Sequence, residues 1–140
     1  MAQSKTFGCA EAVNDGIRCA TVVKTNGHEM IADEMEEVGG ENLGPSPMDY
    51  LCMSLASCKA ITLRMYAKRK HWEVDTIHVK VDFIYNGNAN AGTNTFVCQI
   101  TVTGKIDATQ QKRLQEIAKI CPVSRVLLKQ NEVVTNVSGI

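Results

Sequence analysis

Three cysteines of this sequence stand where sulfur chemistry is possible. Cys52 and Cys58 lie in the mostly apolar segment SPMDYLCMSLASCKA, residues 46–60, and Cys121 lies in KICPVSR, residues 119–125. Six residues turn an α-helix by about 600°, so Cys52 and Cys58 point in different directions and cannot pair with each other. Free cysteine is among the most buried residue types, so packing is the alternative role for each thiol.

Two of these thiols depart from simple packing. Cys121 falls on one helical stripe with Leu114 and Ile117 and directly precedes Pro122. As the cap of a following helix, it would feel the N-terminal dipole of that helix, which stabilises a thiolate. Cys58 is followed by a lysine and has small neighbours that leave room around the sulfur. A thiol in the middle of a helix receives no help from that helix, so Cys58 needs an arginine or lysine from elsewhere to ionise.

The composition limits the other roles that the cysteines can have. The 140 residues begin with MAQSKTFG, which has no apolar segment typical of a signal peptide, and this predicts a cytosolic protein. A structural disulfide framework is unfavourable in that reducing compartment, and no CxxC or clustered Cys/His spacing indicates a zinc site. We therefore interpret Cys19 and Cys98, which lie in alternating segments, as core filler.

The charge balance excludes two classes of partner. Lysine plus arginine equals aspartate plus glutamate, at 15 each, so nothing favours binding to nucleic acid or to an anionic membrane. The most apolar stretch carries Asp49, Lys59 and Arg64, which argues against a membrane span.

The pattern of the N-terminal half predicts a hairpin, a loop and a long helix. Segments 17–25 and 28–34 flank Asn26-Gly27, a strong type I′ turn signal that sets Val23 opposite Met30. Residues 39–47, GGENLGPSP, indicate a loop, and a helix is expected from about 47 to 69, with Ser46 as its cap.

The C-terminal half predicts two strands, two helices and a last strand. Segments 76–86 and 94–104 alternate apolar and polar residues, and NGNANAG, residues 86–92, connects them. A helix is expected from Asp107, with Gln110 as its capping-box partner, and a second one from Pro122. A final strand is expected at 132–140. This order predicts one α+β domain spanning residues 1–140.

The long helix predicts a homodimer. Its apolar residues cover the whole circumference between Met48 and Tyr66, so all of its sides must be covered. One small sheet covers only one side. A second subunit is the simplest cover for the rest, and it places this helix near the centre of a dimer.

The sequence at this point resembles the OsmC/Ohr family of osmotically induced and organic hydroperoxide resistance proteins. The resemblance rests on GPSPMDYLCMSLASC (residues 44–58), TLRMYAKRK (62–70) and IAKICPV (117–123), and it extends over nearly the whole chain. Its specific part is a cysteine on the central helix together with a downstream Cys-Pro.

That resemblance implies a fold and a chemistry. The fold is OsmC-like, with antiparallel sheets around long central helices in an intertwined homodimer. The chemistry is that of a two-cysteine, thiol-dependent peroxidase for organic hydroperoxides, in which Cys58 matches the peroxidatic cysteine and Cys121 the resolving one. An external dithiol resets the site, and no metal or organic cofactor is needed.

Family members with peroxidase activity pair the cysteine with an N-terminal arginine and a glutamate at the start of the helix. Arg18, in the first hairpin, is the best arginine candidate. Met48 stands where the family has the acid, so Asp49, which follows it, is the candidate acid of the site, acting if the helix begins irregularly or across the dimer. Nine residues turn a helix by about 900°, which sets Asp49 half a turn out of phase with Cys58. Alternatively, Asp49 is a first-turn acid favoured by the helix dipole, and Arg18 is a solvent-facing strand residue.

Two other functions stay open on the sequence alone. One is a degenerate member of the family that binds a hydrophobic ligand without turning over peroxide. The other is a structural or stress-associated dimer whose cysteines only pack.

Overall fold

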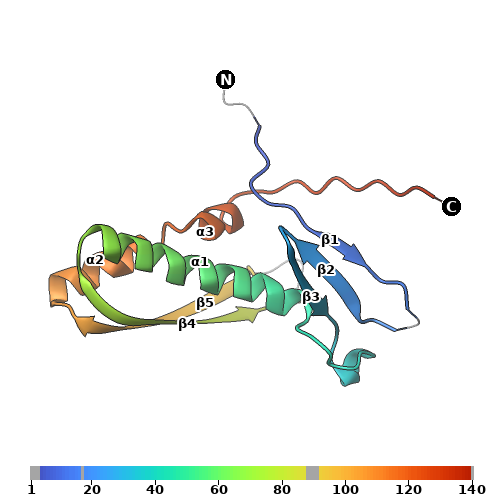
Figure 1. Ribbon diagram of the computed structural model, residues 1–140, viewed down its shortest axis with the longest axis horizontal. Coiled ribbons are helices and arrows are strands. Elements are labelled where there is room, and N and C mark those ends of the chain that lie inside the picture. Colours follow the sequence, from blue (N-terminus) through green and yellow to red (C-terminus); the bar gives the residue numbers. More distant parts are fainter. Residues whose placement is uncertain (1–3, 17, 88–91, 140) are drawn as a thin grey trace. The chain divides into compact units, whose positions relative to one another are not determined.

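The structure is a computed structural model that describes residues 4–16, 18–87 and 92–139. It contains two compact units that divide between Leu51 and Cys52. Both units contain antiparallel sheet, and helices accompany it, so the α+β class expected from the sequence is confirmed. Figure 1 follows the chain through these elements.

The first unit holds a three-stranded antiparallel sheet in the order β1 (Glu11–Val13), β2 (Thr21–Thr25), β3 (His28–Ala32). Strands β2 and β3 form the predicted hairpin, with Val23 opposite Met30. Asn26 and Gly27 both have positive φ, 46° and 81°, as a two-residue type I′ turn requires. The predicted first strand is too long, because β2 begins only at Thr21, and residue 17 lies outside the described residues.

A loop with a short 3₁₀ helix, η1 (Glu36–Val38), leads from β3 to the long helix. Its adjacent glycines, Gly39 and Gly40, are required by backbone geometry. Gly39 has φ 109°, which side chains rarely tolerate. At Gly40, a Cβ atom would collide with the carbonyl of Glu34. The GG pair of the sequence therefore allows the chain to fold tightly back on itself.

Helix α1 spans Pro47–Arg69, the range that the sequence predicts. Ser46 Oγ accepts a hydrogen bond from the Asp49 amide, and the Asp49 carboxylate accepts one from the Ser46 amide, each at 3.1 Å. This reciprocal pair satisfies two backbone donors at the helix start. The basic residues Lys68 and Arg69 lie in the last turn, where they complement the helix dipole.

The second unit pairs β4 (Glu73–Ile84) with β5 (Thr95–Lys105) in a long antiparallel ribbon. Figure 1 shows α1 and α2 (Ala108–Ala118) beside this ribbon. Apolar residues of both strands pack with these helices. The core cluster between these elements comprises Leu63, Tyr66, Ala67, Val74, Leu114, Ile117 and Ala118. Asp107 and Gln110 form the predicted capping box of α2, and α3 (Pro122–Leu127) follows. The middle of the predicted 86–92 connection lies outside the described residues.

The predicted final strand is wrong for the single chain. Residues 132–139 adopt no regular secondary structure, and Val133, Val134 and Val137 are each at least 75% exposed. A strand needs a neighbouring backbone to complete its hydrogen bonds, and none of the described residues pairs with this segment. The apolar pattern that indicated a strand is present, but the chain supplies no partner for it.

One side of α1 stays open in the single chain. Met53, Ile61 and Met65 are 44%, 59% and 67% exposed, and they lie four or eight residues apart on one face of the helix. Leu55, Lys59 and Leu63 form the buried row on another face. Among the described residues, no helix is both long and apolar enough to cross a bilayer.

Candidate functional site

Cys58 lies on α1, half-buried, at the point where the turn between α2 and α3 reaches this helix. Its Sγ accepts a hydrogen bond from the Val123 amide, with the nitrogen 3.5 Å away. Val123 is the second residue of α3, and Cys121 is the N-cap of that helix. The fold therefore brings the Cys58 sulfur to the turn that carries Cys121.

Cys121 is completely buried, with 0% of its surface exposed. Its extended backbone, φ −64° and ψ 149°, leads into Pro122 at the first position of α3, as expected for a residue before proline. Its side chain makes no capping hydrogen bond. The sequence predicts that the N-terminus of α3 acts on the Cys121 thiol. In the structure, a backbone N–H in the first turn of α3 points instead to the Cys58 sulfur. Which thiol receives this N–H depends on how α3 packs against α1, and the local sequence does not specify that packing.

Lys59 also contributes to this region, in a role that the local sequence pattern hardly indicates. It is 6% exposed, and its Nζ donates to the carbonyl oxygen of Ala118 at 2.6 Å and to Ser124 Oγ at 3.2 Å. A lysine inside an apolar helix was the only signal. Its partners, 59 and 65 residues away along the chain, could not be identified from the local pattern.

Cys98 lies on β5, half-buried, and lines a cavity of about 420 Å³ together with Lys59, Leu63 and Ile100. Burial raises the pKa of the Cys98 thiol. The positive charge of Lys59 acts in the opposite direction, whereas Cys121 and Cys52 raise the pKa further. Cys98 is thus a half-buried thiol near Lys59, Cys121 and Cys52.

Cys19 is exposed, so the prediction that it fills the core is wrong. It precedes β2 instead of lying in the strand, and its thiol donates to the Gly39 carbonyl at 3.7 Å. Cys9 is exposed as well.

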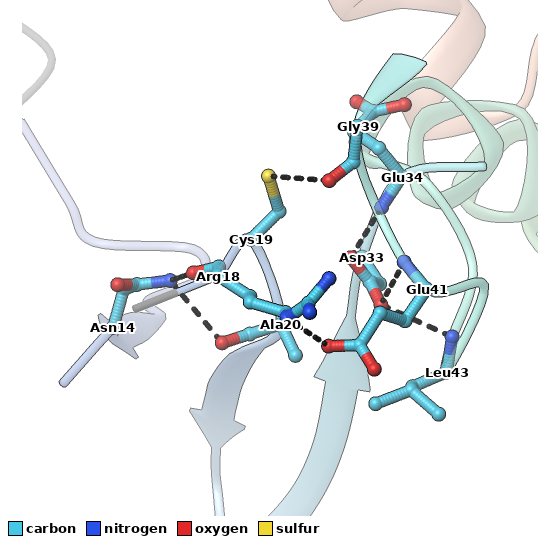
Figure 2. A network of polar contacts seen from close by, with 9 residues as sticks. All are labelled: Asn14, Arg18, Cys19, Ala20, Asp33, Glu34, Gly39, Glu41 and Leu43. Atoms are coloured by element: carbon cyan, nitrogen blue, oxygen red, sulfur yellow. Dashed lines mark hydrogen bonds and ion pairs between the residues drawn. The ribbon is translucent and has the colours of Figure 1, made fainter. Parts of the chain in front are cut away.

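Arg18 lies just before β2, with most of its side chain exposed (Figure 2). Its Nε is 3.3 Å from Oε1 of Glu41, a residue of the glycine loop. The Arg18 carbonyl accepts a hydrogen bond from the Asn14 side chain at 2.9 Å. The structure therefore gives Arg18 a carboxylate partner that the sequence argument did not consider.

Asp33 fastens the loop that presents Glu41. This buried carboxylate accepts hydrogen bonds from the backbone amides of Glu34, Glu41 and Leu43 at 2.8, 3.2 and 3.1 Å (Figure 2). The bond from the Glu34 amide is the largest cause of a lowered pKa at Asp33; desolvation opposes it, and the Leu43 and Glu41 amides add to the lowering.

The lowered pKa predicts acid sensitivity of this loop. A carboxyl with a folded pKa below its unfolded value of about 3.9 stabilises the fold at higher pH, and the contribution is lost as pH falls through the folded pKa. We expect Asp33→Asn to be less stable than wild type at neutral pH and the difference to shrink below about pH 4. Thermal unfolding of wild type and Asp33→Asn at a series of pH values measures this difference in stability. Asp15→Asn, at an exposed position, is the control. A difference that stays constant down to acid pH would contradict the role of the charge.

Asp49 is occupied at the start of α1, where it forms the reciprocal pair with Ser46. This is the first-turn role that the sequence left as its alternative. Arg18 and Asp49 belong to the first unit, and Cys58 and Cys121 to the second. Among the four predicted site residues, the structure of the second unit brings the segments of two together, those of Cys58 and Cys121. Within the described part of the chain, no three His, Cys, Asp or Glu side chains are grouped as a metal ion would need.

The profile of the OsmC-like protein family matches residues 39–138, which include both cysteines and the long helix. The chain belongs to the OsmC-like protein family. No curated protein is significantly similar to this OsmC-like protein in sequence.

Solved structures show the same fold. An OsmC-like protein from Mycoplasma pneumoniae has a TM-score of 0.71 at 17% identity, covering 89% of each chain. The organic hydroperoxide resistance protein OsmC from Legionella pneumophila scores 0.68 at 18% identity, covering 90% of this chain and 92% of its own. An organic hydroperoxide resistance protein from Elizabethkingia anophelis scores 0.64 at 19%, covering 91% of both. The OsmC-like fold of the single chain is thus confirmed, and the intertwined homodimer stays a prediction.

Proposed function

We propose that this OsmC-like protein is a thiol-dependent peroxidase that reduces organic hydroperoxides to alcohols in the cytosol. One observation carries the proposal: the Cys58 sulfur accepts the Val123 amide at 3.5 Å, directly beside the turn of Cys121. A donor at the sulfur and a second cysteine in the adjoining turn are what a two-cysteine reaction requires. Support also comes from similar structures named organic hydroperoxide resistance proteins.

The chemistry uses the two cysteines in order. The Cys58 thiolate attacks the outer oxygen of the hydroperoxide, the O–O bond breaks, and the alkoxide leaves as an alcohol after taking a proton. Cys58 becomes a sulfenic acid. The Cys121 sulfur then attacks the Cys58 sulfur, an S–S bond forms, the S–O bond breaks, and water leaves with the thiol proton. An external dithiol reduces the disulfide and restores both thiols.

The peroxidase works, in this proposal, as one OsmC-like domain of residues 1–140 in a homodimer. The open row on α1, with Met53, Ile61 and Met65, supplies an apolar surface that a second copy would cover. An apolar environment around Cys58 favours an alkyl or aryl hydroperoxide over hydrogen peroxide.

A thiol titration with cumene hydroperoxide tests the function. The reduced protein is mixed with the hydroperoxide, and peroxide loss and free thiols are measured with and without an external dithiol. We expect two thiols per chain to be lost for each peroxide reduced, and continued turnover when dithiol is present. Hydroperoxide that stays unreduced in the presence of reduced protein would overturn the proposal.

A second candidate function has its own observation in support. Asp49 is engaged with Ser46, and Arg18 with Glu41, so neither is free in this arrangement to serve a thiolate. A family member that lacks an available acid and arginine would bind a hydrophobic ligand without turnover. In the same titration, such a protein would leave the hydroperoxide intact while the ligand shields Cys58 from alkylating reagents.

Arg18→Ala tests whether a cation of the first unit activates Cys58. We expect slower reaction with hydroperoxide and an unchanged fold, because the Arg18 side chain is largely exposed. A cation that stabilises the negative charge on the attacking sulfur by about 1.4 kcal/mol speeds the attack about tenfold, so its loss should slow the reaction by about that factor. Stopped-flow oxidation of Cys58 measures the rate, with Lys80→Ala, in the exposed Lys80–Asp82 pair, as the control. An unchanged rate would exclude Arg18 as the activating residue.

A further inference from the structure

Lys59 occupies a position that normally belongs to an apolar residue. It lies four residues from Leu55 and four from Leu63, in the row of α1 that faces the core, and all three are buried. Removing an ammonium group from water is costly unless hydrogen bonds replace its hydration. The structure describes no ion pair between Lys59 and a carboxylate within its resolved ranges. Neutral acceptors must therefore hold the buried charge.

The two acceptors lie on either side of the turn that carries Cys121. Ala118, whose carbonyl is 2.6 Å from Nζ, is the last residue of α2. Ser124, whose hydroxyl is 3.2 Å from Nζ, lies in the first turn of α3. A cation at the C-terminal end of α2 also complements the dipole of that helix. One ammonium thus fastens both ends of residues 119–123 to α1.

We propose that Lys59 is a positioning residue that holds the Cys121 turn where the Cys121 sulfur can reach the Cys58 sulfur. This inference rests on the proposed function, because it concerns the resolving step of that reaction. Lys59 follows Cys58 directly on a rigid helix, so the ammonium fixes the turn relative to the Cys58 backbone. The Val123 amide, which belongs to the same turn, then points at the Cys58 sulfur.

The resolving step is sensitive to such positioning. A disulfide requires Cα atoms about 4.4–6.8 Å apart and a narrow range of dihedral angles. Displacement of reacting groups by about 1 Å can slow a reaction by about a hundredfold. Hydrogen bonds from a charged donor are stronger than neutral ones, and here they join segments distant in sequence. Lys59 therefore restricts the turn more than apolar packing alone.

Direct activation of sulfur is the competing role for this lysine. Its charge does lower the pKa of the Cys98 thiol, against the larger effect of burial. However, within the described residues the hydrogen bonds of its Nζ go to a carbonyl and a hydroxyl oxygen, and none goes to a sulfur. If Lys59 is a positioning residue, its loss should slow disulfide formation between Cys58 and Cys121. If it activates a sulfur, its loss should slow the first attack on peroxide.

A redox-buffer equilibrium tests the inference without relying on peroxide. The full-length protein is equilibrated with reduced and oxidised glutathione, and the effective concentration of Cys121 toward Cys58 is measured by mass spectrometry. We expect Lys59→Met to lower it about tenfold or more, as loss of orientation predicts. Lys112→Met, at an exposed position of α2, should match wild type. With one equivalent of hydroperoxide, Lys59→Met should still consume the peroxide, but the resolving step should slow more than the first attack, so that a sulfenic acid accumulates and dimedone traps it.

Further variants decide the outcome if Lys59→Met does not fold. Ser124→Ala removes one acceptor and keeps the charge, and it should lower the effective concentration by a smaller factor. Lys59→Arg should restore part of the loss. A folded Lys59→Met with the wild-type value, or an unchanged Ser124→Ala, overturns the inference, as does a wild-type protein in which the two thiols never join. Wild type that forms the disulfide in glutathione but consumes no hydroperoxide overturns the proposed function alone.

Discussion

Cys58→Ser is expected to abolish the reduction of organic hydroperoxide completely, whereas Cys121→Ser is expected to stop after one equivalent. The two variants should fail differently because the two sulfurs act in sequence in the proposed mechanism. Without the Cys58 sulfur no atom attacks the peroxide, and no disulfide forms. Without the Cys121 sulfur the first attack proceeds, but the sulfenic acid persists and is open to over-oxidation to the sulfinic acid.

Peroxide consumption and intact-mass spectrometry separate these outcomes. Wild type treated with one equivalent of hydroperoxide should contain a disulfide between Cys58 and Cys121 within one chain. Serine at Cys9, Cys19, Cys52 or Cys98 should leave turnover near the wild-type level. A dominant disulfide that involves Cys52, or a complete set of free thiols after treatment, would end the two-cysteine assignment and favour the ligand-binding alternative.

The second large effect concerns assembly. Analytical ultracentrifugation at micromolar concentration should show one species near twice the chain mass of 15.3 kDa. The exposed row of α1 is the reason, since burial of a large apolar side chain contributes about 1.5–3 kcal/mol, and a symmetric contact buries the row twice.

A charge placed in that row tests the same surface. Ile61→Glu should convert the dimer to monomers or to aggregates, because a carboxylate in an apolar contact loses its hydration. Thr109→Glu, at an exposed position in the first turn of α2, is the matched control and should stay dimeric. A well-folded wild-type monomer at micromolar concentration would contradict the prediction.

Local signals in the sequence were enough to predict much of the fold. The Asn26-Gly27 turn determined the hairpin register, because two positive φ angles in succession admit few residue types. Ser46 and Pro47 marked the start of α1, and Asp107 with Gln110 marked the start of α2, because capping depends on side chains within three residues. Strand β1 was missed because its three exposed residues carry no alternation and are held only by pairing with β2.

The site could be predicted only in part, for a physical reason. Cysteine type and spacing indicated Cys58 and Cys121. The contacts that orient them, from Val123 and Lys59, join residues 59 to 65 positions apart and arise only when α2 and α3 pack on α1. The Arg18–Glu41 pair likewise depends on the loop that Asp33 closes. The predicted last strand was wrong for a related reason. The sequence pattern of residues 132–140 specifies an apolar face, but it does not supply the neighbouring strand that pairing requires.

The complete burial of Cys121 has a consequence for the reductive half of the cycle. A thiolate must approach a disulfide in line with the S–S bond, so an incoming dithiol can reach only a sulfur with open space behind it. Cys121 is 0% exposed, whereas Cys58 is half-buried. In the proposed cycle, reduction is therefore expected to be regioselective, with the mixed disulfide on Cys58 and Cys121 as the leaving group. A reductant with only one of its two thiols intact should stay covalently attached to Cys58. The protein can therefore be used to isolate its own reductant as a mixed disulfide.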